Sequence, residues 1–286
     1  MRQERPVRIS LKIPALLGAT VLALLLTPAA APGQAAVMPA PANVDPTLAA
    51  AIASPARAPA LASRDAVRHP GLELTFFGLK PAMTVVELWP GAGYWTDILG
   101  AYLAPRGHYY VALPAPGDKG EDEGTAHWRA AVAAQGSRLG VIHETMLGAG
   151  HFDIAPPGSA DLVLTFRNLH NWMDGGYADA ALAACFRALK PGGILGIEEH
   201  RARTDQPQDP RAKNGYVRQD YTIEMAKRAG FVLVDSSEMN ANPRDTKDWV
   251  DGVWTLPPTL SQKDKDRDRY IAIGEADNYV MKFRKP

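Results

Sequence analysis

The stretch that decides the fold is Thr84–Tyr94, which reads TVVELWPGAGY. Its first five residues form a largely apolar, β-branched run, which is typical of a buried strand. A proline and two glycines one residue apart then turn the chain, and a helical pattern over residues 96–103 follows. A strand that ends in a glycine-rich turn and leads into a helix indicates an open α/β sheet, whose ligands bind beyond the carboxyl ends of the strands.

The same alternation of strands and helices continues along the rest of the chain. Further strands are predicted at residues 109–113, 139–143, 161–165, 194–198, 231–235 and 278–283, and further helices at 125–135, 177–189 and 219–229. Strands that alternate with helices of this length form a parallel sheet with helices on both faces. We therefore expect a single α/β domain.

The first residues have the pattern of a secretory leader. Four basic residues precede the apolar run Ile13–Leu26, small residues follow it, and no charge appears between Lys12 and Asp45. This pattern predicts a signal peptide over residues 1–35 and export, to the periplasm, with no stable membrane insertion after the leader is removed. The run is short for a spanning helix of ~20 residues, so a membrane anchor through an uncleaved leader is the alternative.

Residues 36–62 are rich in alanine and proline and contain few large side chains. Such a composition buries little apolar area, so we expect a spacer, with the folded domain spanning residues 63–286. Within the spacer, Asp45 followed by Pro46 predicts the start of a short helix through Ile52, because aspartate caps helices and proline is favoured at their first position.

Composition limits the function classes. The chain has 286 residues, of which 46% are hydrophobic, and 31 basic residues balance 31 acidic ones. A balanced charge argues against a nucleic-acid partner, which needs a basic surface. The leader holds four of the basic residues and one of the acidic ones, so the remainder is slightly acidic. The single cysteine, Cys185, excludes an intramolecular disulfide and, on an apolar helix stripe, is expected in the core.

Three motifs carry a resemblance to a known family. The strand and turn of residues 85–93 resemble the first motif of class I S-adenosylmethionine-dependent methyltransferases. Residues 161–172 (DLVLTFRNLHNW) resemble the fourth-strand motif of that family, and residues 189–195 (LKPGGIL) the segment before its fifth strand. The resemblance covers roughly residues 63–286 and is closer to a group of exported predicted methyltransferases that share the Trp-Pro-Gly turn and the runs at 240–248 and 252–258. It implies a Rossmann-like domain with a mostly parallel seven-stranded sheet, and S-adenosylmethionine as cofactor.

The resemblance also implies a cofactor site. Its expected members are Glu87, Gly91, Gly93, Asp153 and Asn168. Gly91 and Gly93 would pass beneath the methionine part, Glu87 would organise the turn and the ammonium end, and Asp153 would approach the adenine. Asn168 would lie beside the transferable methyl.

Two departures from the family pattern concern the same site. Trp89 stands where the family has its first glycine. The family's second strand also ends in an acidic residue that holds the ribose, whereas this chain has Leu113-Pro114 there. Asp118 or Glu121 in the loop that follows could take over that role.

The candidate catalytic residues are His170, Glu199 and His200, since a general base is needed if the acceptor must lose a proton. Along a strand Glu199 and His200 should point to opposite sides, so only one is expected to face the ligand. Arg201 or Arg203 could neutralise Glu198 and Glu199 in a purely structural ion-pair patch. The two histidines and Glu199 could also be metal ligands, but their spacing does not favour it and we expect no metal.

We expect a methyltransferase acting on an unidentified small molecule, with oligomeric state left open. The segment 240–251 and the tryptophan and leucine residues after it are expected to fold over the cleft and shape the acceptor pocket. An exported compartment is at odds with a cofactor made in the cytoplasm. The alternative function is therefore a non-catalytic exported binding protein that uses the methyltransferase-like cleft for another ligand.

Overall fold

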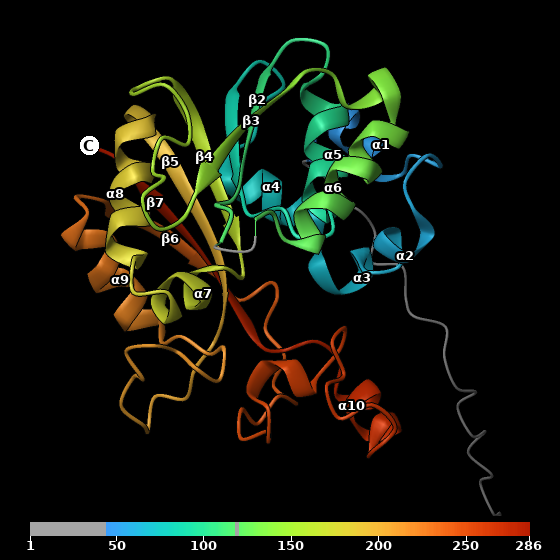
Figure 1. The fold of residues 1–286 in the computed structure, drawn as a ribbon, viewed down its shortest axis with the longest axis vertical. Helices are drawn as coiled ribbons and strands as arrows, with labels where there is room; N and C mark the ends of the chain where they lie inside the picture. The colour runs from blue at the N-terminus through green and yellow to red at the C-terminus, as the bar shows by residue number, and fades with distance from the viewer. Residues whose placement is uncertain (1–43, 118–119) are drawn as a thin grey trace, which may run out of the picture. The chain divides into compact units, whose positions relative to one another are not determined.

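The computed structural model describes residues 44–117 and 120–286. Within them one sheet has the strand order β3-β2-β1-β4-β5-β7-β6 (Figure 1). The strands are β1 (Thr84–Leu88), β2 (His108–Pro114), β3 (Ile142–Leu147), β4 (Ala160–Phe166), β5 (Leu189–His200), β6 (Val232–Ser237) and β7 (Asn278–Arg284). Only β7 runs antiparallel to its neighbours, β5 and β6. The predicted mostly parallel seven-stranded α/β domain is confirmed.

Helices cover both faces of the sheet. They are α1 (Pro46–Ile52), α2 (Pro59–Ala62), α3 (Asp65–Arg68), α4 (Pro70–Phe77), α5 (Tyr94–Leu103), α6 (Glu123–Ala134), α7 (Leu169–Asp174), α8 (Ala178–Ala188), α9 (Gln219–Arg228) and α10 (Arg267–Ile273), with 3₁₀ turns at Gly136–Leu139 and Gly252–Thr255. One buried cluster joins a sheet face to α1, α4, α5 and α6, and a second joins the other face to α7, α8 and α9. Figure 1 shows these two groups on opposite sides of the strands.

The centre of the sheet fixes where a ligand can bind. β1 pairs with β2 on one side and with β4 on the other, so the chain leaves the two central strands in opposite directions. The crevice at such a switch point, beyond the carboxyl ends of the strands, is the usual binding site of open α/β sheets. The strands β1, β4 and β5 therefore position the site.

The third strand differs from its prediction. The sequence predicts it at residues 139–143, but β3 spans Ile142–Leu147. Leu139 instead ends a 3₁₀ turn, and the Leu139 side chain packs against Gly100 of α5. β3 lies at the edge of the sheet and only Leu147 of its six residues is buried. An edge strand with so little buried surface lacks the continuous apolar pattern on which the prediction depends.

The predicted spacer is wrong for its described part. Residues 46–52 form α1, and its Leu48 is buried against the cluster that contains α5. Arg57 is also buried and donates to the carbonyl of Ile52 at 2.7 Å and to Asp65 at 2.6 Å. A few well-placed large side chains thus anchor an alanine-rich segment, and the folded body begins before residue 63.

Two smaller predictions are confirmed. The Asp45 carboxylate accepts hydrogen bonds from the backbone amides of Thr47 (2.8 Å) and Leu48 (3.2 Å), and Pro46 opens the helix, as expected for this cap. Cys185 is buried on α8, and burial raises the pKa of its thiol to about 12, so it is a core residue.

The predicted leader, residues 1–35, lies outside the described residues. Among the helices that the structure does describe, none combines the length and the apolar character needed to cross a membrane.

Candidate functional site

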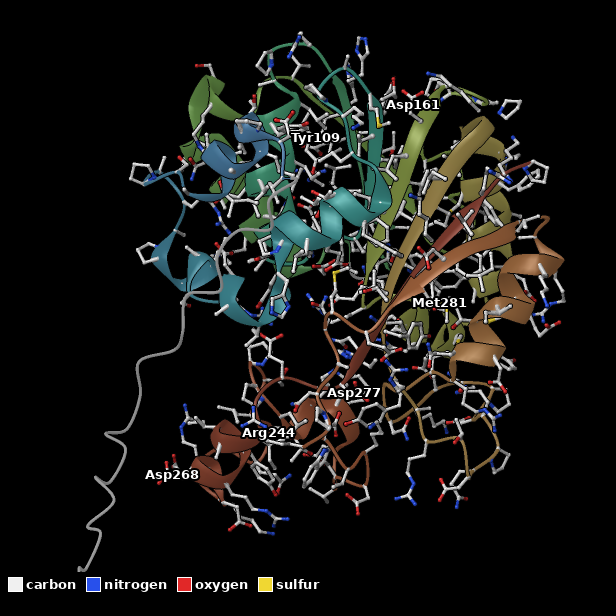
Figure 2. All side chains as sticks on the ribbon, turned by 180° about the vertical axis from the view of Figure 1, so that it is seen from behind. Tyr109, Asp161, Arg244, Asp268, Asp277 and Met281 are labelled. Carbon is white, nitrogen blue, oxygen red and sulfur yellow. The ribbon has the colours of Figure 1, made fainter. Side chains whose placement is uncertain are left out.

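A cavity of about 370 Å³ lies at the carboxyl edge of β1, β4 and β5. Its wall combines the glycine turn after β1, the end of β4 and start of α7, the end of β5, and two segments distant in sequence, residues 64–68 and 253–259. Figure 2 shows the C-terminal segment, with Arg244 and Asp277 labelled, gathered at that end of the strands. This is where the topology predicts the ligand site.

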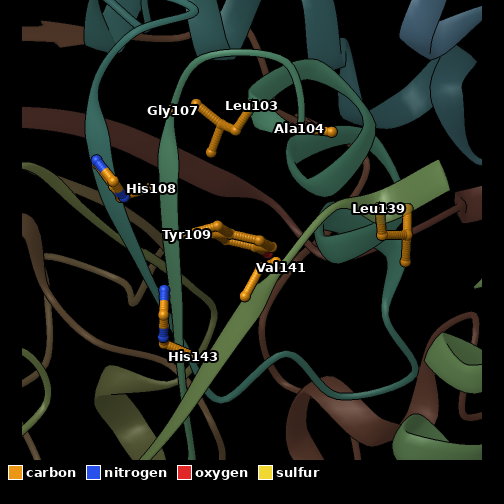
Figure 3. A pocket seen from close by; sticks show the side chains of 8 residues that line it. All are labelled: Leu103, Ala104, Gly107, His108, Tyr109, Leu139, Val141 and His143. Carbon is orange, nitrogen blue, oxygen red and sulfur yellow. The ribbon is translucent and has the colours of Figure 1, made fainter. Parts of the chain in front are cut away.

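A second cavity, of about 280 Å³, lies elsewhere (Figure 3). Tyr109 and His108 at the start of β2 line it, together with His143 near the start of β3 and with Leu139. These are the amino ends of the strands, opposite the switch point. The location does not favour this cavity as the ligand site.

The two glycines of the turn have different surroundings. Gly91 lines the first cavity in a left-handed conformation (φ 55°), and a Cβ added there would meet no atom within 4 Å. Gly93 is also left-handed (φ 83°), but its Cβ would lie 3.3 Å from Cδ1 of Trp128. Gly91 therefore leaves room for a ligand, whereas the space beside Gly93 is filled by the protein's own indole.

Glu87 is buried beneath the turn rather than on the cavity wall. Its Oε2 accepts hydrogen bonds from the Thr96 hydroxyl (2.8 Å) and from the Tyr109 hydroxyl, and its Oε1 has no partner among the described residues. Burial raises the pKa of Glu87 to about 7, although the two hydroxyl hydrogen bonds act in the opposite direction. Glu87 thereby joins β1, α5 and β2, which fixes the framework that carries the glycine turn.

Asn168 ties the fourth strand to the glycine turn. Its Nδ2 donates to the carbonyl of Leu88 at 3.1 Å and to that of Trp89 at 3.2 Å. This holds the end of β4 against the end of β1, beside the cavity. Asn168 is a positioning residue in this arrangement.

The three predicted catalytic residues lie together. Nδ1 of His170 is 2.9 Å from Oε1 of Glu199, and the backbone amides of His170 and His200 also donate to that carboxylate, at 3.1 and 2.8 Å. His170 and His200 line the cavity, with ring centroids 5.3 Å apart, whereas Glu199 is fully buried behind them. As strand alternation predicts, only one of the residues 199 and 200 faces the cavity.

The charges of this cluster follow from its contacts. Burial alone would raise the pKa of Glu199, but His170 and the His200 amide outweigh it, so the pKa of Glu199 is lowered and it is an anion. Burial lowers the pKa of His200 to about 3, which keeps that imidazole neutral. Its Nδ1 is 2.7 Å from Oδ1 of Asn278. An ionised Glu199 beside His170 Nδ1 fixes the imidazole and leaves Nε2 for a ligand.

The same three side chains could be considered a metal site, since ligand atoms of all three lie within 4.8 Å of one another. However, both carboxylate oxygens of Glu199 already accept hydrogen bonds from N–H groups. Oε1 accepts two of these hydrogen bonds, from the His170 ring and the His200 amide, whereas Oε2 accepts one, from the His170 amide. In the structure Glu199 acts as a carboxylate that orients His170.

Several residues of the wall were not predicted as site residues. Arg64, Arg68, Arg167 and Glu275 line the cavity, and Arg167 donates to Glu198 at 2.8 Å. The alternative in which Arg201 or Arg203 neutralises Glu198 and Glu199 is wrong. Arg201 instead pairs with Asp277 and Glu238, and Arg203 pairs with Asp205.

The segment 240–251 was expected to cover the cleft, but none of its residues lines the cavity, which residues of the stretch 253–259 after it line instead. Trp254 lines the cavity and lies edge-on to His170, with ring centroids 5.9 Å apart, and Pro257 and Pro258 complete that wall. Leu256 is instead buried in a small separate cluster with Tyr270.

The nucleoside side of a cofactor fits this structure less well. The Trp89 indole donates to the carbonyl of Leu147 at 2.8 Å, so it extends across the end of β2 to the end of β3. At the end of β2 stand Leu113 and Pro114, and Glu121 is engaged by Arg129. Asp118 lies outside the described residues. Asp153 is exposed, is 3.8 Å from Arg187, and is not among the cavity residues. The residues present therefore fit the methionine end of S-adenosylmethionine, at Gly91, and offer no carboxylate on β2 for its ribose.

Comparison with known proteins supports the fold. No family model and no curated sequence matches this chain. Among solved structures it is similar to an S-adenosylmethionine-dependent methyltransferase from Aquifex aeolicus (TM-score 0.53, 16% identity, 78% of this chain and 93% of that one). It is also similar to the [4+2]-cyclase SpnF (TM-score 0.53, 17% identity, 77% and 81%).

A third similar structure is an N-methyltransferase from Haemonchus contortus in complex with phosphomonomethylethanolamine and S-adenosylhomocysteine (TM-score 0.50, 16% identity, 75% of this chain and 52% of that one). At these identities the likeness concerns the fold alone. The chain has the Rossmann-like fold of class I S-adenosylmethionine-dependent methyltransferases.

Proposed function

We propose that the chain is an S-adenosylmethionine-dependent methyltransferase that acts on a small molecule held in the cavity at the ends of β1, β4 and β5. The observation that carries the proposal is the open space beside Gly91. A left-handed glycine with no atom within 4 Å of its Cβ position lines the same cavity as His170 and Arg167. A backbone that can approach a ligand closely, at the switch point of this fold, is what the methionine end of the cofactor requires.

The bound cofactor would supply an electrophilic methyl group on a positively charged sulfur. The protein then contributes positioning and electrostatics, because direct methyl transfer needs no covalent enzyme intermediate. Asn168 fixes the end of β4 against the glycine turn. His170, oriented by Glu199, presents Nε2 to take a proton from an acceptor. The neutral state of His200 keeps a further positive charge off the wall of this cavity, which would favour a cofactor that is itself a cation.

Calorimetric titration of the full chain with S-adenosylmethionine and S-adenosylhomocysteine tests this function. We expect saturable binding of both, and its loss in Gly91→Asp, whose side chain would enter the cavity. Gly192→Asp is the matched control, because Gly192 has a similar left-handed φ (79°) and equally open surroundings but lies at the start of β5, outside the cavity. Absence of heat at millimolar ligand, or equal affinities of the two variants, would reject the proposal.

A second function is favoured by a separate observation. Trp89 reaches across the end of β2, and Trp128 fills the space beside Gly93, so part of the region expected to hold the cofactor is occupied by side chains. The alternative is a non-catalytic binding protein whose ligand occupies the cavity without a cofactor. The fold also occurs in the [4+2]-cyclase SpnF, whose name denotes a different reaction. A protein that binds ligands in the cavity but neither cofactor form would favour this alternative.

We also propose that residues 1–35 direct export to the periplasm. The support is the sequence pattern of basic residues followed by the apolar run Ile13–Leu26. Fusion of residues 1–70 to a reporter that is active only outside the cytoplasm should give signal, and a silent reporter would reject the leader. Cell fractionation distinguishes a released protein from one anchored through the uncleaved apolar run.

A further inference from the structure

Three arginines line the cavity, and only one of them is fully paired. Arg64 binds Glu275 with two short contacts, Nε to Oε1 at 2.7 Å and Nη2 to Oε2 at 2.6 Å. Among the residues that the structure describes, Glu275 is the only carboxylate on the wall of this cavity. Arg68 is 3.7 Å from the same carboxylate, beyond hydrogen-bond distance. Glu275 therefore gives its hydrogen bonds to Arg64 and reaches Arg68 only through a longer, shared ion pair.

Arg68 is unusual for a buried cation. It is 5% exposed, and its Nε has no hydrogen-bond partner among the described residues. The guanidinium lies over the ring of Tyr94, 4.4 Å from the centroid, which places it but does not satisfy its N–H groups. Burial, and next the positive charge of Arg167, lower the pKa of Arg68 to about 9. A buried guanidinium with an unsatisfied donor and one long, shared ion pair is costly, which favours a ligand that supplies the missing acceptor.

Arg167 contributes a second guanidinium to the same cavity from the end of β4. It has a left-handed backbone (φ 61°) and donates to Oε2 of Glu198 at 2.8 Å. The other oxygen of Glu198 accepts hydrogen bonds from Asn240 (2.9 Å) and Asn278 (3.3 Å), so this carboxylate is shared among several donors behind the wall. Burial, and next the charge of Glu198, raise the pKa of Glu73, which weakens it as a counter-charge for the arginines.

We propose that Arg68 and Arg167 form an anion subsite, and that the ligand of this cavity carries a carboxylate or a phosphate between them. This inference deepens the proposed function, on which it rests for the identity of the reaction site. An anion there would satisfy the donors of Arg68 and relieve its repulsion by Arg167, with the strength of a charge-assisted hydrogen bond. His170 lines the same cavity, so the anionic group is bound beside the candidate general base.

An anionic group at this subsite has two candidate sources. The anion is either the carboxylate of the cofactor's methionine part or an acidic group of the acceptor. The open space at Gly91 and the arginines belong to one cavity of about 370 Å³, so both sources fit the site. The experiment separates them.

The first arm titrates the full chain with inorganic phosphate and with acetate by calorimetry, in chloride buffer of matched ionic strength. We expect saturable binding that falls at least about tenfold in Arg68→Gln, with a smaller loss in Arg68→Lys, which keeps the charge but not the forked donors. Arg228→Gln is the control for lost positive charge, since Arg228 pairs with Asp179 on the surface. Phosphate and acetate that bind wild type and Arg68→Gln equally, or that bind neither, would overturn the subsite.

If Arg68→Gln does not fold, Arg68→Lys takes its place in the test. The phosphate affinity of Arg68→Lys is then compared with that of the Arg228→Gln control, and we expect it to be lower. Equal affinities of these two variants would then overturn the proposal.

The second arm uses S-adenosylmethionine and 5′-methylthioadenosine, which lacks the carboxylate. Competition between phosphate and S-adenosylmethionine, with 5′-methylthioadenosine unaffected by Arg68→Gln, supports the cofactor carboxylate as the anion. Simultaneous binding of phosphate and S-adenosylmethionine supports an anionic acceptor. A protein that binds phosphate through Arg68 but neither nucleoside would refute the methyltransferase proposal and leave the anion subsite standing, so the two failures are distinguishable.

Discussion

Glu87 should make the stability of this protein depend on pH in a direction opposite to that of an ordinary paired carboxylate. Burial raises its pKa from 4.5 to about 7. Between these values the folded state keeps a proton that the unfolded state releases, so the free energy of unfolding falls as the pH rises through this window. At about 1.4 kcal/mol per pH unit, the loss reaches about 3 kcal/mol by pH 8. Glu87→Gln removes it, because an amide does not ionise.

The assay is urea unfolding of wild type and Glu87→Gln at pH 4.5 and pH 8, followed by circular dichroism and tryptophan fluorescence. The added buried N–H of glutamine changes the free energy of unfolding by the same amount at both pH values. The decisive quantity is therefore how the difference in unfolding free energy between the two proteins changes with pH. From pH 4.5 to pH 8, we expect the unfolding free energy of Glu87→Gln to rise by about 3 kcal/mol relative to that of wild type. Glu224→Gln, at an exposed glutamate of α9, is the control. A difference that stays constant with pH would refute the reasoning.

Three further variants test other parts of the structure. Leu48→Ala should lower the free energy of unfolding by about 2–5 kcal/mol in chemical denaturation, because Leu48 is buried. An unchanged stability would mean that α1 is not part of the folded domain. Gly93→Ala should lower the melting temperature more than Gly192→Ala, because both are left-handed but only the first new Cβ meets Trp128; equal losses would contradict this packing. His170→Gln should slow methyl transfer by about 10²–10⁴-fold with the affinity for S-adenosylhomocysteine unchanged, whereas loss of affinity would make it a binding residue.

The sequence was sufficient to predict the sheet because its central strands are buried on both faces. The runs that became β1 and β4 are continuous apolar segments that end in turns, which identifies them without knowledge of their partners. The helix cap at Asp45 is equally local. The edge strand β3 was misplaced because its neighbours cover little of it.

The candidate site was only partly predictable, because its contacts are long-range. Gly91, His170 and His200 follow strand ends, so topology alone brings them to one edge. Arg64 and Glu275 are separated by 211 positions, and nothing local marks either as part of a cavity. The role of Trp89 depends on the carbonyl of Leu147, which the pattern of residues does not reveal.

Several strained or electrostatically costly residues lie around the cavity, which supports a functional site there by an argument that does not depend on the comparisons. Trp89 and Arg167 both have left-handed backbones directly after β1 and β4, although neither is a glycine. Arg68 is a buried cation whose Nε has no hydrogen-bond partner among the described residues, and Glu199 is a buried anion held by His170. Each such feature costs of order 1–3 kcal/mol and would be removed by a sequence selected for stability alone. Their position around one cavity is what a site that trades stability for ligand binding would show.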